Sequence, residues 1–235
     1  MLGIRTPCDG VRHLEIERPE RHNALNIPLY EALTAALKDA SEDPAVRVIV
    51  LSSAGKSFCA GNDLADFDSA WPQPPRGPVY QFLETLYHTK LPIVAAVQGA
   101  AIGVGATLLL HCDVIFAAPD AYLRFPFVDL GIVMEGGSTH LLPRLLGQAR
   151  AMEIMLSGRK VGSVEAHHLG LITSVVDNPA QAAHDFVAMV ATKSVAAVRA
   201  TKRLSRWSLD AYLPDRLEAE IQEINKLIVA RKGGP

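Results

Sequence analysis

The stretch Ile93-Val94-Ala95-Ala96-Val97-Gln98-Gly99-Ala100-Ala101-Ile102-Gly103-Val104-Gly105 decides the fold class of this chain. Its first five residues are small or β-branched and predict a buried strand. The glycines that follow predict a turn into a helical run over 106–111, after which 113–118 resumes extended structure. A strand, a helix and another strand in this order are typical of parallel pairing in an α/β protein.

The same alternation of strands and helices runs through the neighbouring sequence. Residues 11–16 and 46–51 predict two more strands, and the segment between them has leucines at helical spacing. Another helix is predicted over 79–88, and residues 182–228 are helical in pattern with a break at Pro214. We therefore expect an α/β fold with a parallel sheet, followed by a helical C-terminal segment.

The composition restricts the class of protein. The chain has 235 residues, of which 49% are hydrophobic and 20% charged, enough to bury the core of one main domain. The formal net charge of −2 gives no drive toward nucleic acid or an anionic membrane. Cys8, Cys59 and Cys112 have no paired spacing, so a disulfide framework is not expected.

The localisation follows from the cysteines and from the apolar segments. The longest largely apolar run, 100–110, has 11 residues and includes two glycines, which is too short to span a bilayer. The N-terminus lacks the basic and then apolar order of a signal peptide. We expect a cytoplasmic protein in a reducing compartment, without nucleic acid or membrane partners.

One carboxylate lies in an apolar segment that ends in two glycines. The segment is Leu130-Gly131-Ile132-Val133-Met134-Glu135-Gly136-Gly137-Ser138. Burial among apolar residues raises the pKa of a carboxyl group, and a raised pKa suits a base that removes a proton near neutral pH. Glu135 is therefore the candidate catalytic base. The alternative is a structural carboxylate that caps the following helix or pairs with Arg144.

The glycine-rich segment 99–105 does not fit the dinucleotide-binding fingerprint. Read from Gly103, that fingerprint requires glycine at position 108, where the chain has Leu108. A strand that turns through small residues into a helix leaves backbone N–H groups free near Val104, and such donors suit an anion or a developing oxyanion. Close packing of the strand on the helix is the other use of these small residues.

Four segments in sequence order carry a resemblance to a known family. They are Phe58-Cys59-Ala60-Gly61-Asn62-Asp63-Leu64, the glycine-rich segment 99–105, Asp113, and 130–137. Together they are similar to the crotonase, or enoyl-CoA hydratase/isomerase, superfamily. The resemblance implies an α/β fold with a crotonase-like ββα spiral core over residues 1–190. It also implies that residues 191–235 form a C-terminal helical segment used for oligomerisation.

The resemblance implies a role for individual positions. In the family, two backbone N–H groups form the oxyanion hole for the acyl-CoA thioester, and here they fall on Asn62 and Val104. CoA is part of the substrate, so no separate cofactor is implied. No cluster of His, Cys and acidic residues has the spacing of a metal site. The segment that lies against CoA corresponds to Ala60, Gly61, Asn62, Asp63 and Leu64.

Two positions at which the chain departs from the family pattern indicate which of the family's activities it has. Members that hydrate a double bond carry two glutamates, and the matching positions here hold Thr107 and Phe127. A hydroxyl group and a phenyl ring cannot replace the acid and base that hold a water between them. The lone carboxylate at Glu135 is similar to the Δ3,Δ2-enoyl-CoA isomerases, in which one glutamate moves a proton from C2 to C4. The resemblance therefore implies an isomerase that moves a double bond from C3 to C2 of an acyl-CoA.

Two other functions stay open. Glu135 is alternatively a nucleophile, as in superfamily members of the hydrolase or dehalogenase type that act on acyl-CoAs. The remaining alternative is a hydratase-like protein with little catalysis. A covalent adduct on Glu135 distinguishes the first of these from isomerisation.

The resemblance also implies assembly into a homotrimer or homohexamer. The last helical segment has an apolar stripe that either supplies an interface or packs on its own domain. Lys56, Lys202 and Arg203 are candidates for contact with CoA phosphates, with a solvated surface position as the alternative. The members of the stripe are Leu217, Ile221, Ile224 and Ile228.

Overall fold

Two β-sheets form the framework of the protein. The computed structural model describes residues 1–66, 71–210 and 212–232, without the side chains of 207–210. The larger sheet has six strands in the order β1-β2-β3-β4-β6-β9, and the smaller sheet has three in the order β5-β7-β8. The strands are β1 Leu2–Arg5, β2 Val11–Ile16, β3 Val48–Ser53, β4 Ile93–Val97, β5 Ala100–Ile102, β6 Val114–Ala117, β7 Tyr122–Arg124, β8 Lys160–Gly162 and β9 Ser174–Val175.

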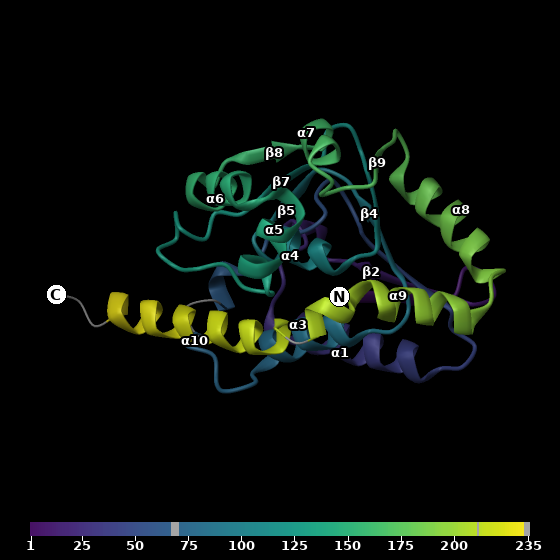
Figure 1. The fold of residues 1–235 in the computed structure, drawn as a ribbon, viewed down its shortest axis with the longest axis horizontal. Helices are drawn as coiled ribbons and strands as arrows, with labels where there is room; N and C mark the ends of the chain where they lie inside the picture. The colour runs from purple at the N-terminus through teal and green to yellow at the C-terminus, as the bar shows by residue number, and fades with distance from the viewer. Residues whose placement is uncertain (67–70, 211, 233–235) are drawn as a thin grey trace.

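The chain builds the two sheets together, one turn after another. Neighbours in the larger sheet run parallel except β1, which pairs antiparallel with β2. After β4 the chain continues through Gly99 into β5, and after β6 it continues into β7, which pairs parallel with β5. Cys59, which follows β3, pairs with Ala101 beside them. This arrangement is the predicted crotonase-like spiral, in which successive turns add to both sheets (Figure 1).

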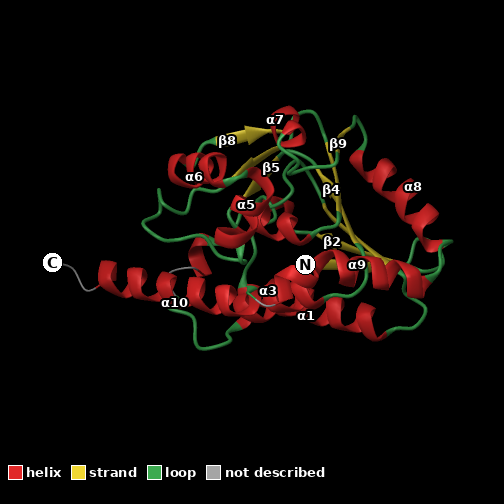
Figure 2. Cartoon of the chain, in the orientation of Figure 1, coloured by secondary structure: helices red, strands yellow, loops and turns green. Residues whose placement is uncertain are grey.

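Both faces of the larger sheet are covered. Val48, Val50 and Val94 pack against helix α8 on one face, whereas Ile49 and Leu51 point into the main core, which includes residues of α1 and α3. Figure 2 shows α8 on one side of the strands and α1 and α3 on the other. Because successive side chains of a strand point to opposite faces, a strand covered on both sides has a continuous apolar run.

Helices connect the strands and cover the sheets. Asn26 caps α1 by accepting from the N–H of Leu29 at 3.1 Å, and Asn178 caps α8 by accepting from the N–H of Gln181 at 3.0 Å. The helical segments are η1 Pro19–Arg21, α1 Ile27–Glu42, α3 Pro78–His88, α4 Val104–Thr107, η2 Leu108–His111, α5 Ser138–Leu146, α6 Gln148–Ser157, α7 Ser163–His168, α8 Pro179–Ala191, α9 Val195–Asp210 and α10 Leu213–Lys232.

The predicted α/β class is confirmed. Strands β1, β5, β7, β8 and β9 were not predicted, and the predicted helices differ from the observed ones at their ends. The helical run predicted over 106–111 is instead the single turn α4 followed by the 3-10 helix η2. The helical C-terminal pattern is interrupted at 192–194, between α8 and α9. Pro214 lies in the first turn of α10, where its missing N–H costs no helical hydrogen bond.

The apolar stripe of α10 is buried inside the chain. This helix packs against α3 and α5, and the stripe joins the same hydrophobic core as the sheets. It is therefore not free to form a subunit interface, and any oligomerisation through 191–235 has to use other residues. Of that segment, 211 and 233–235 lie outside the described residues. The four stripe residues are at most 5% exposed: Leu217, Ile221, Ile224 and Ile228.

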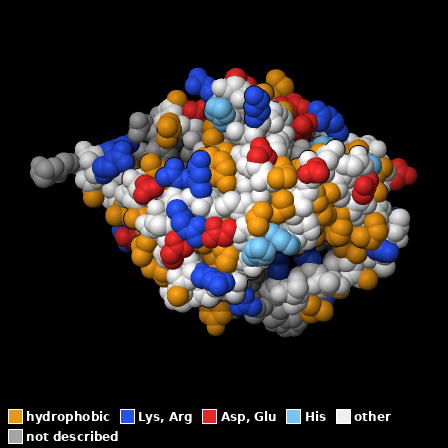
Figure 3. All heavy atoms as spheres, turned by 90° about the horizontal axis from the view of Figure 1, so that it is seen from above, with side chains coloured by type: hydrophobic (Ala, Val, Ile, Leu, Met, Phe, Trp, Pro, Cys, Tyr) orange, Lys and Arg blue, Asp and Glu red, His pale blue; other side chains and the backbone are white. Residues whose placement is uncertain are grey.

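The surface mixes side chains of different kinds. On the face seen in Figure 3, acidic and basic side chains lie among hydrophobic ones. Across the described ranges, no helix combines the length and the apolar character that crossing a bilayer requires. Even α10, with 20 residues, carries acidic and basic side chains along its length.

Candidate active site

Glu135 lies in the loop between β7 and α5, where its carboxyl group is enclosed. The residue is 1% exposed. Gly136 and Gly137 follow with φ of 74° and 69°, a backbone conformation that glycine adopts without strain. The carbonyl oxygen of Glu135 accepts from the hydroxyl of Ser138 at 2.5 Å. The loop is thus fixed by its backbone, and the side chain is left for other contacts.

The two carboxyl oxygens of Glu135 have different surroundings. The hydroxyl of Thr107 donates to Oε1 at 2.6 Å, whereas Oε2 is buried and has no hydrogen-bond partner among the described residues. Burial raises the pKa of Glu135 to about 8, the bond from Thr107 lowers it, and the charge of Glu220 raises it. Glu135 therefore neither caps α5 with its side chain nor pairs with Arg144.

Two facing glycines present the predicted amide donors. Gly61 and Gly103 have φ of 101° and 55°, and a Cβ on Gly61 would lie 3.1 Å from the carbonyl oxygen of Ile102, so the two turns are in close contact. The next residue in each turn is Asn62 or Val104. Neither of their N–H groups donates to another group within the described part of the chain. The structure therefore leaves two neighbouring backbone donors free, as an oxyanion site requires.

Close packing explains the third glycine of this region. A Cβ on Gly105 would lie 2.4 Å from the carbonyl oxygen of Cys59. Only glycine fits between α4 and the segment that follows β3. Of the two uses predicted for the small residues, close packing is therefore confirmed at Gly105, and the oxyanion donor at Val104 stays a prediction.

Short contacts connect the amide donors to Glu135. Val104 and Thr107 belong to the same turn, α4, and Thr107 reaches the carboxyl group of Glu135. The hydroxyl of Tyr30 donates to Oδ1 of Asn62 at 2.5 Å. Burial raises the pKa of Tyr30 well above its ordinary value, and the charge of Glu135 adds to this effect. The three predicted groups are therefore brought to one place.

Hydrogen bonds and an ion pair with other parts of the chain hold the segment that was predicted to lie against CoA. The N–H of Ala60 donates to His22, and the carboxylate of Asp63 pairs with Arg18 at 2.6 Å. The bond from Arg18 lowers the pKa of Asp63 below its usual range. Leu64, by contrast, is 74% exposed. The segment 60–64 thus offers a ligand backbone atoms and one apolar side chain, while the charge of Asp63 is already used.

Glu220 of α10 is a second buried carboxylate near Glu135, and its role was not predicted. It accepts from the N–H of Gly137 at 2.6 Å, and from the N–H and hydroxyl of Thr139 at 3.0 and 2.5 Å. Burial raises its pKa to about 7. The signal in the sequence was a glutamate beside Ile221 in the apolar stripe. Glu220 ties the C-terminal helix to the loop that carries Glu135.

Two further polar residues lie behind this loop. Nε2 of His111 is 2.7 Å from the carbonyl oxygen of Gly136 and donates to it. Burial lowers the pKa of His111 to about 4, so its imidazole is neutral at pH 7. Lys202 is 7% exposed and donates to Asp113 at 2.7 Å. The suggestion that Lys202 meets a CoA phosphate is therefore wrong, because its ammonium group is already buried in an ion pair.

The described part of the chain has no group of three or more His, Cys, Asp or Glu side chains placed to hold a metal ion.

The fold and the site define the class of the protein. Over residues 7–233 the chain matches the family described as enoyl-CoA hydratase/isomerase. The chain belongs to this family.

The names of similar proteins include both isomerases and hydratases. The chain is 40% identical over 176 residues to 1,2-epoxyphenylacetyl-CoA isomerase from Escherichia coli (strain K12), covering 72% of this chain and 67% of that protein. It is 36% identical over 222 residues to a "Probable enoyl-CoA hydratase" from Rhodobacter capsulatus, covering 90% and 84%. The crystal structure of an enoyl-CoA hydratase/isomerase from Pseudoalteromonas atlantica T6c aligns with a TM-score of 0.92 and 36% identity, covering 97% of this chain and 91% of that one.

Proposed function

We propose that the protein is an enoyl-CoA isomerase that moves a double bond from C3 to C2 of an acyl-CoA thioester. The observation that carries this proposal is one buried carboxyl group with an unpartnered oxygen, Oε2 of Glu135, close to the free N–H groups of Asn62 and Val104. Moving a proton between two carbons needs one group that accepts the proton and returns it. Holding the enolate between these steps needs preorganised donors.

The reaction proceeds in two proton transfers. The ionised carboxylate of Glu135 takes a proton from C2 of the 3-enoyl thioester, and the electron pair moves into the carbonyl to give a dienolate. The dienolate oxygen accepts from the N–H groups of Asn62 and Val104, each contributing about 3 kcal/mol of transition-state stabilisation. Glu135 then returns the proton to C4 with the C3–C4 electron pair, the C1–C2 pair moves to C2–C3, and the carbonyl re-forms.

Thr107 has a positioning role in this scheme. Its hydroxyl holds Oε1 of Glu135 at 2.6 Å, so the proton is exchanged at Oε2. We propose that CoA lies along Ala60 to Leu64 and contacts their backbone. The exposed side chain of Leu64 supports this placement.

The same residues argue against hydration of a 2-enoyl thioester. Adding water requires one group to activate it and another to protonate the α-carbon. Thr107 is bonded to Glu135, and Phe127 offers only a buried phenyl ring. The nearby carboxylate of Glu220 is occupied by Gly137 and Thr139. Glu135 therefore lacks a described partner carboxylate free to hold the water with it.

A second candidate is the isomerisation of an epoxide on an aromatic acyl-CoA. It is supported by the name of the Escherichia coli relative at 40% identity. A carboxyl group whose pKa is about 8 is mostly protonated at pH 7, as opening a strained C–O bond by proton donation requires. Consumption of 1,2-epoxyphenylacetyl-CoA, with none of a 3-enoyl-CoA, would favour this function.

The test of the main proposal compares two substrates of equal chain length. With a 3-enoyl-CoA, we expect the absorbance of the conjugated thioester to appear, and with a 2-enoyl-CoA we expect it to persist. Hydration of the 2-enoyl-CoA at the rate of isomerisation would contradict the proposal. A covalent adduct on Glu135, detected by mass spectrometry, would instead support a nucleophilic role.

A further inference from the structure

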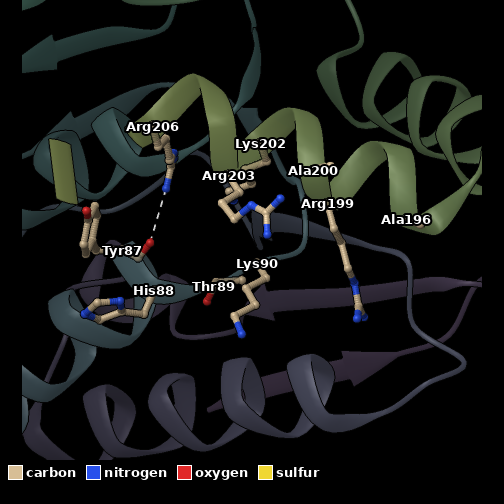
Figure 4. Close-up of a pocket in the computed structure, with 10 residues that line it drawn as sticks. All are labelled: Tyr87, His88, Thr89, Lys90, Ala196, Arg199, Ala200, Lys202, Arg203 and Arg206. Atoms are coloured by element: carbon tan, nitrogen blue, oxygen red, sulfur yellow. Dashed lines mark hydrogen bonds between the residues drawn. The ribbon is translucent and has the colours of Figure 1, made fainter. Parts of the chain in front are cut away.

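A basic cavity lies between α9 and the turn that follows α3. Its volume is about 490 Å³, which is within the usual range of small-ligand sites. Figure 4 shows Arg199 and Arg203 extending from α9 toward the turn that carries Lys90. Ala196 and Ala200 form an apolar part of the cavity wall. The cavity is thus lined by both cationic and apolar side chains.

Two of the cations that line this cavity are bonded within the protein. Lys202 donates to Asp113 at 2.7 Å, and Arg206 pairs with the same carboxylate at 3.5 Å. Arg206 also donates to the carbonyl oxygens of His111 and Tyr87, at 2.5 and 3.4 Å. These bonds fix the inner wall of the cavity. They also mean that the carboxylate of Asp113 is already paired with Lys202 and Arg206.

The other three cations are not paired. Lys90, Arg199 and Arg203 have no hydrogen bond or ion pair with any described residue. Nε of Arg199 is a buried donor without a partner, and leaving a buried donor unbonded is unfavourable. Like charges held in one cavity also repel each other. An anion in the cavity would satisfy the donor and remove the repulsion.

The cavity is at the opposite end of the larger sheet from the amide donors. Lys90 precedes β4 and Asp113 precedes β6, so the cavity lies where these parallel strands begin. Val104 lies beyond the end of β4, and Asn62 beyond the end of β3. Five strand residues separate the two ends by about 16 Å. The length of the strands therefore separates this cavity from the amide donors.

We propose that this cavity is a second site, which binds a small molecule carrying two or more phosphate groups. Each arginine fork binds phosphate oxygens in a bidentate way, and Lys90 adds a point charge. Three unpaired cations require more than the charge of one monoanion. The alanines leave room for an apolar part of the same ligand. The proposal does not depend on the reaction at Glu135.

The test is isothermal titration calorimetry with inorganic pyrophosphate at low ionic strength. We expect one pyrophosphate per chain, and binding weakened about tenfold or more by Arg203→Ala and by Lys90→Ala. The matched control is Arg150→Ala, because Arg150 is exposed on α6 and has no bond to a described residue. It should bind pyrophosphate as the wild-type protein does. Glu135→Gln should also bind it unchanged.

Three results would overturn the proposal. They are equal affinity of the wild-type protein and both cavity variants, no binding at millimolar pyrophosphate, and citrate bound as tightly as pyrophosphate. The last of these would show recognition of charge without preference for phosphate. Thermal unfolding without ligand checks that the variants fold. Lys90 and Arg203 lie on different elements, so each variant tests the site independently.

Discussion

The hydroxyl of Thr107 lies 2.6 Å from Oε1 of Glu135 and donates to it. This bond stabilises the ionised carboxylate, whereas burial favours the neutral acid and raises the pKa of Glu135 to about 8. Thr107 therefore does two things for the proposed base. It fixes the orientation of the carboxyl group, and it keeps the pKa closer to neutral pH than burial alone would.

The rate of isomerisation should rise with pH. If Glu135 acts first as a base, only its ionised form reacts, and its pKa is about 8. We expect kcat/KM for a 3-enoyl-CoA to increase about tenfold per pH unit below this value and to level off above it. Initial rates at low substrate concentration across this range provide the check. A profile that falls with rising pH would instead identify the neutral acid as the reactive form.

Replacing Thr107 should move that profile. Thr107→Val removes a hydrogen bond that lowers the pKa of Glu135, so the inflection should shift upward by about one pH unit. Thr107→Ser keeps the hydroxyl and should restore the wild-type profile. An unchanged inflection in Thr107→Val would mean that the bond does not tune the base in solution.

Replacing Glu135 should stop proton transfer while leaving binding intact. Glu135→Gln keeps the shape of the side chain and removes the base, so turnover of a 3-enoyl-CoA should fall at least ~100- to 10,000-fold. The affinity for a saturated acyl-CoA should be nearly unchanged. Glu223→Gln, on the surface of α10, is the control. Turnover of Glu135→Gln near the wild-type rate would assign the proton transfer to another residue.

Stability should fall as the pH rises from about 5 to 8. The folded-state pKa values of Glu135 and Glu220, about 8 and about 7, exceed the ordinary value of 4.5. Below 4.5 both groups are protonated in the folded and unfolded states. As the pH rises above it, the unfolded chain releases these protons first, which favours unfolding by up to about 1.4 kcal/mol per pH unit for each group.

Urea denaturation at several pH values measures this slope. Glu135→Gln removes the contribution of that group, so its free energy of unfolding should depend less on pH than that of the wild-type protein. Equal slopes for Glu135→Gln and the wild-type protein would indicate that Glu135 titrates normally in the folded state.

The apolar stripe on α10 should contribute to the free energy of unfolding. Ile221 is 5% exposed and packs in the core of its own chain, so Ile221→Asp should lower the free energy of unfolding by at least ~3 kcal/mol. Val229 on the same helix is 56% exposed, and Val229→Asp should change it by less than about 0.5 kcal/mol. Urea denaturation compares the two variants.

Sedimentation of the same variants tests the alternative use of the stripe. Clean conversion of an oligomer into a folded monomer by Ile221→Asp would contradict its burial within one chain. Assembly into a homotrimer or homohexamer stays a prediction of the family resemblance. Sedimentation of the wild-type protein tests it directly.

Local patterns were sufficient to predict four of the six strands of the larger sheet, β2, β3, β4 and β6, whereas β1 and β9 were not predicted. Strand 11–16 has the predicted bounds, and β4 matches the apolar run that was used to predict it. The strand predicted over 46–51 lies at Val48–Ser53 instead. Its last two residues are serines, which pair with Glu15 and Ile16 of β2. That pairing depends on a neighbouring strand, so the residues themselves do not reveal it.

The motifs predicted roles for the candidate site residues, and these roles stay predictions, but the motifs did not predict the partners of these residues. Thr107 is 28 residues from Glu135 in the sequence, and Glu220 is 83 residues from Gly137. Thr107 was interpreted only as the absence of a second carboxylate. Contacts over such separations are set by how the turns of the spiral stack. A single sequence gives no sign of them.

The two proposed amide donors cannot be removed by ordinary mutagenesis. The N–H groups of Asn62 and Val104 belong to the backbone, so an alanine scan changes their side chains and leaves both donors in place. Such a scan would point to Glu135 and Thr107 alone. Replacing one amide by an ester through chemical synthesis or nonsense suppression removes the N–H itself. The same property means that substitutions at 62 and 104 toward other acyl groups would keep both proposed donors.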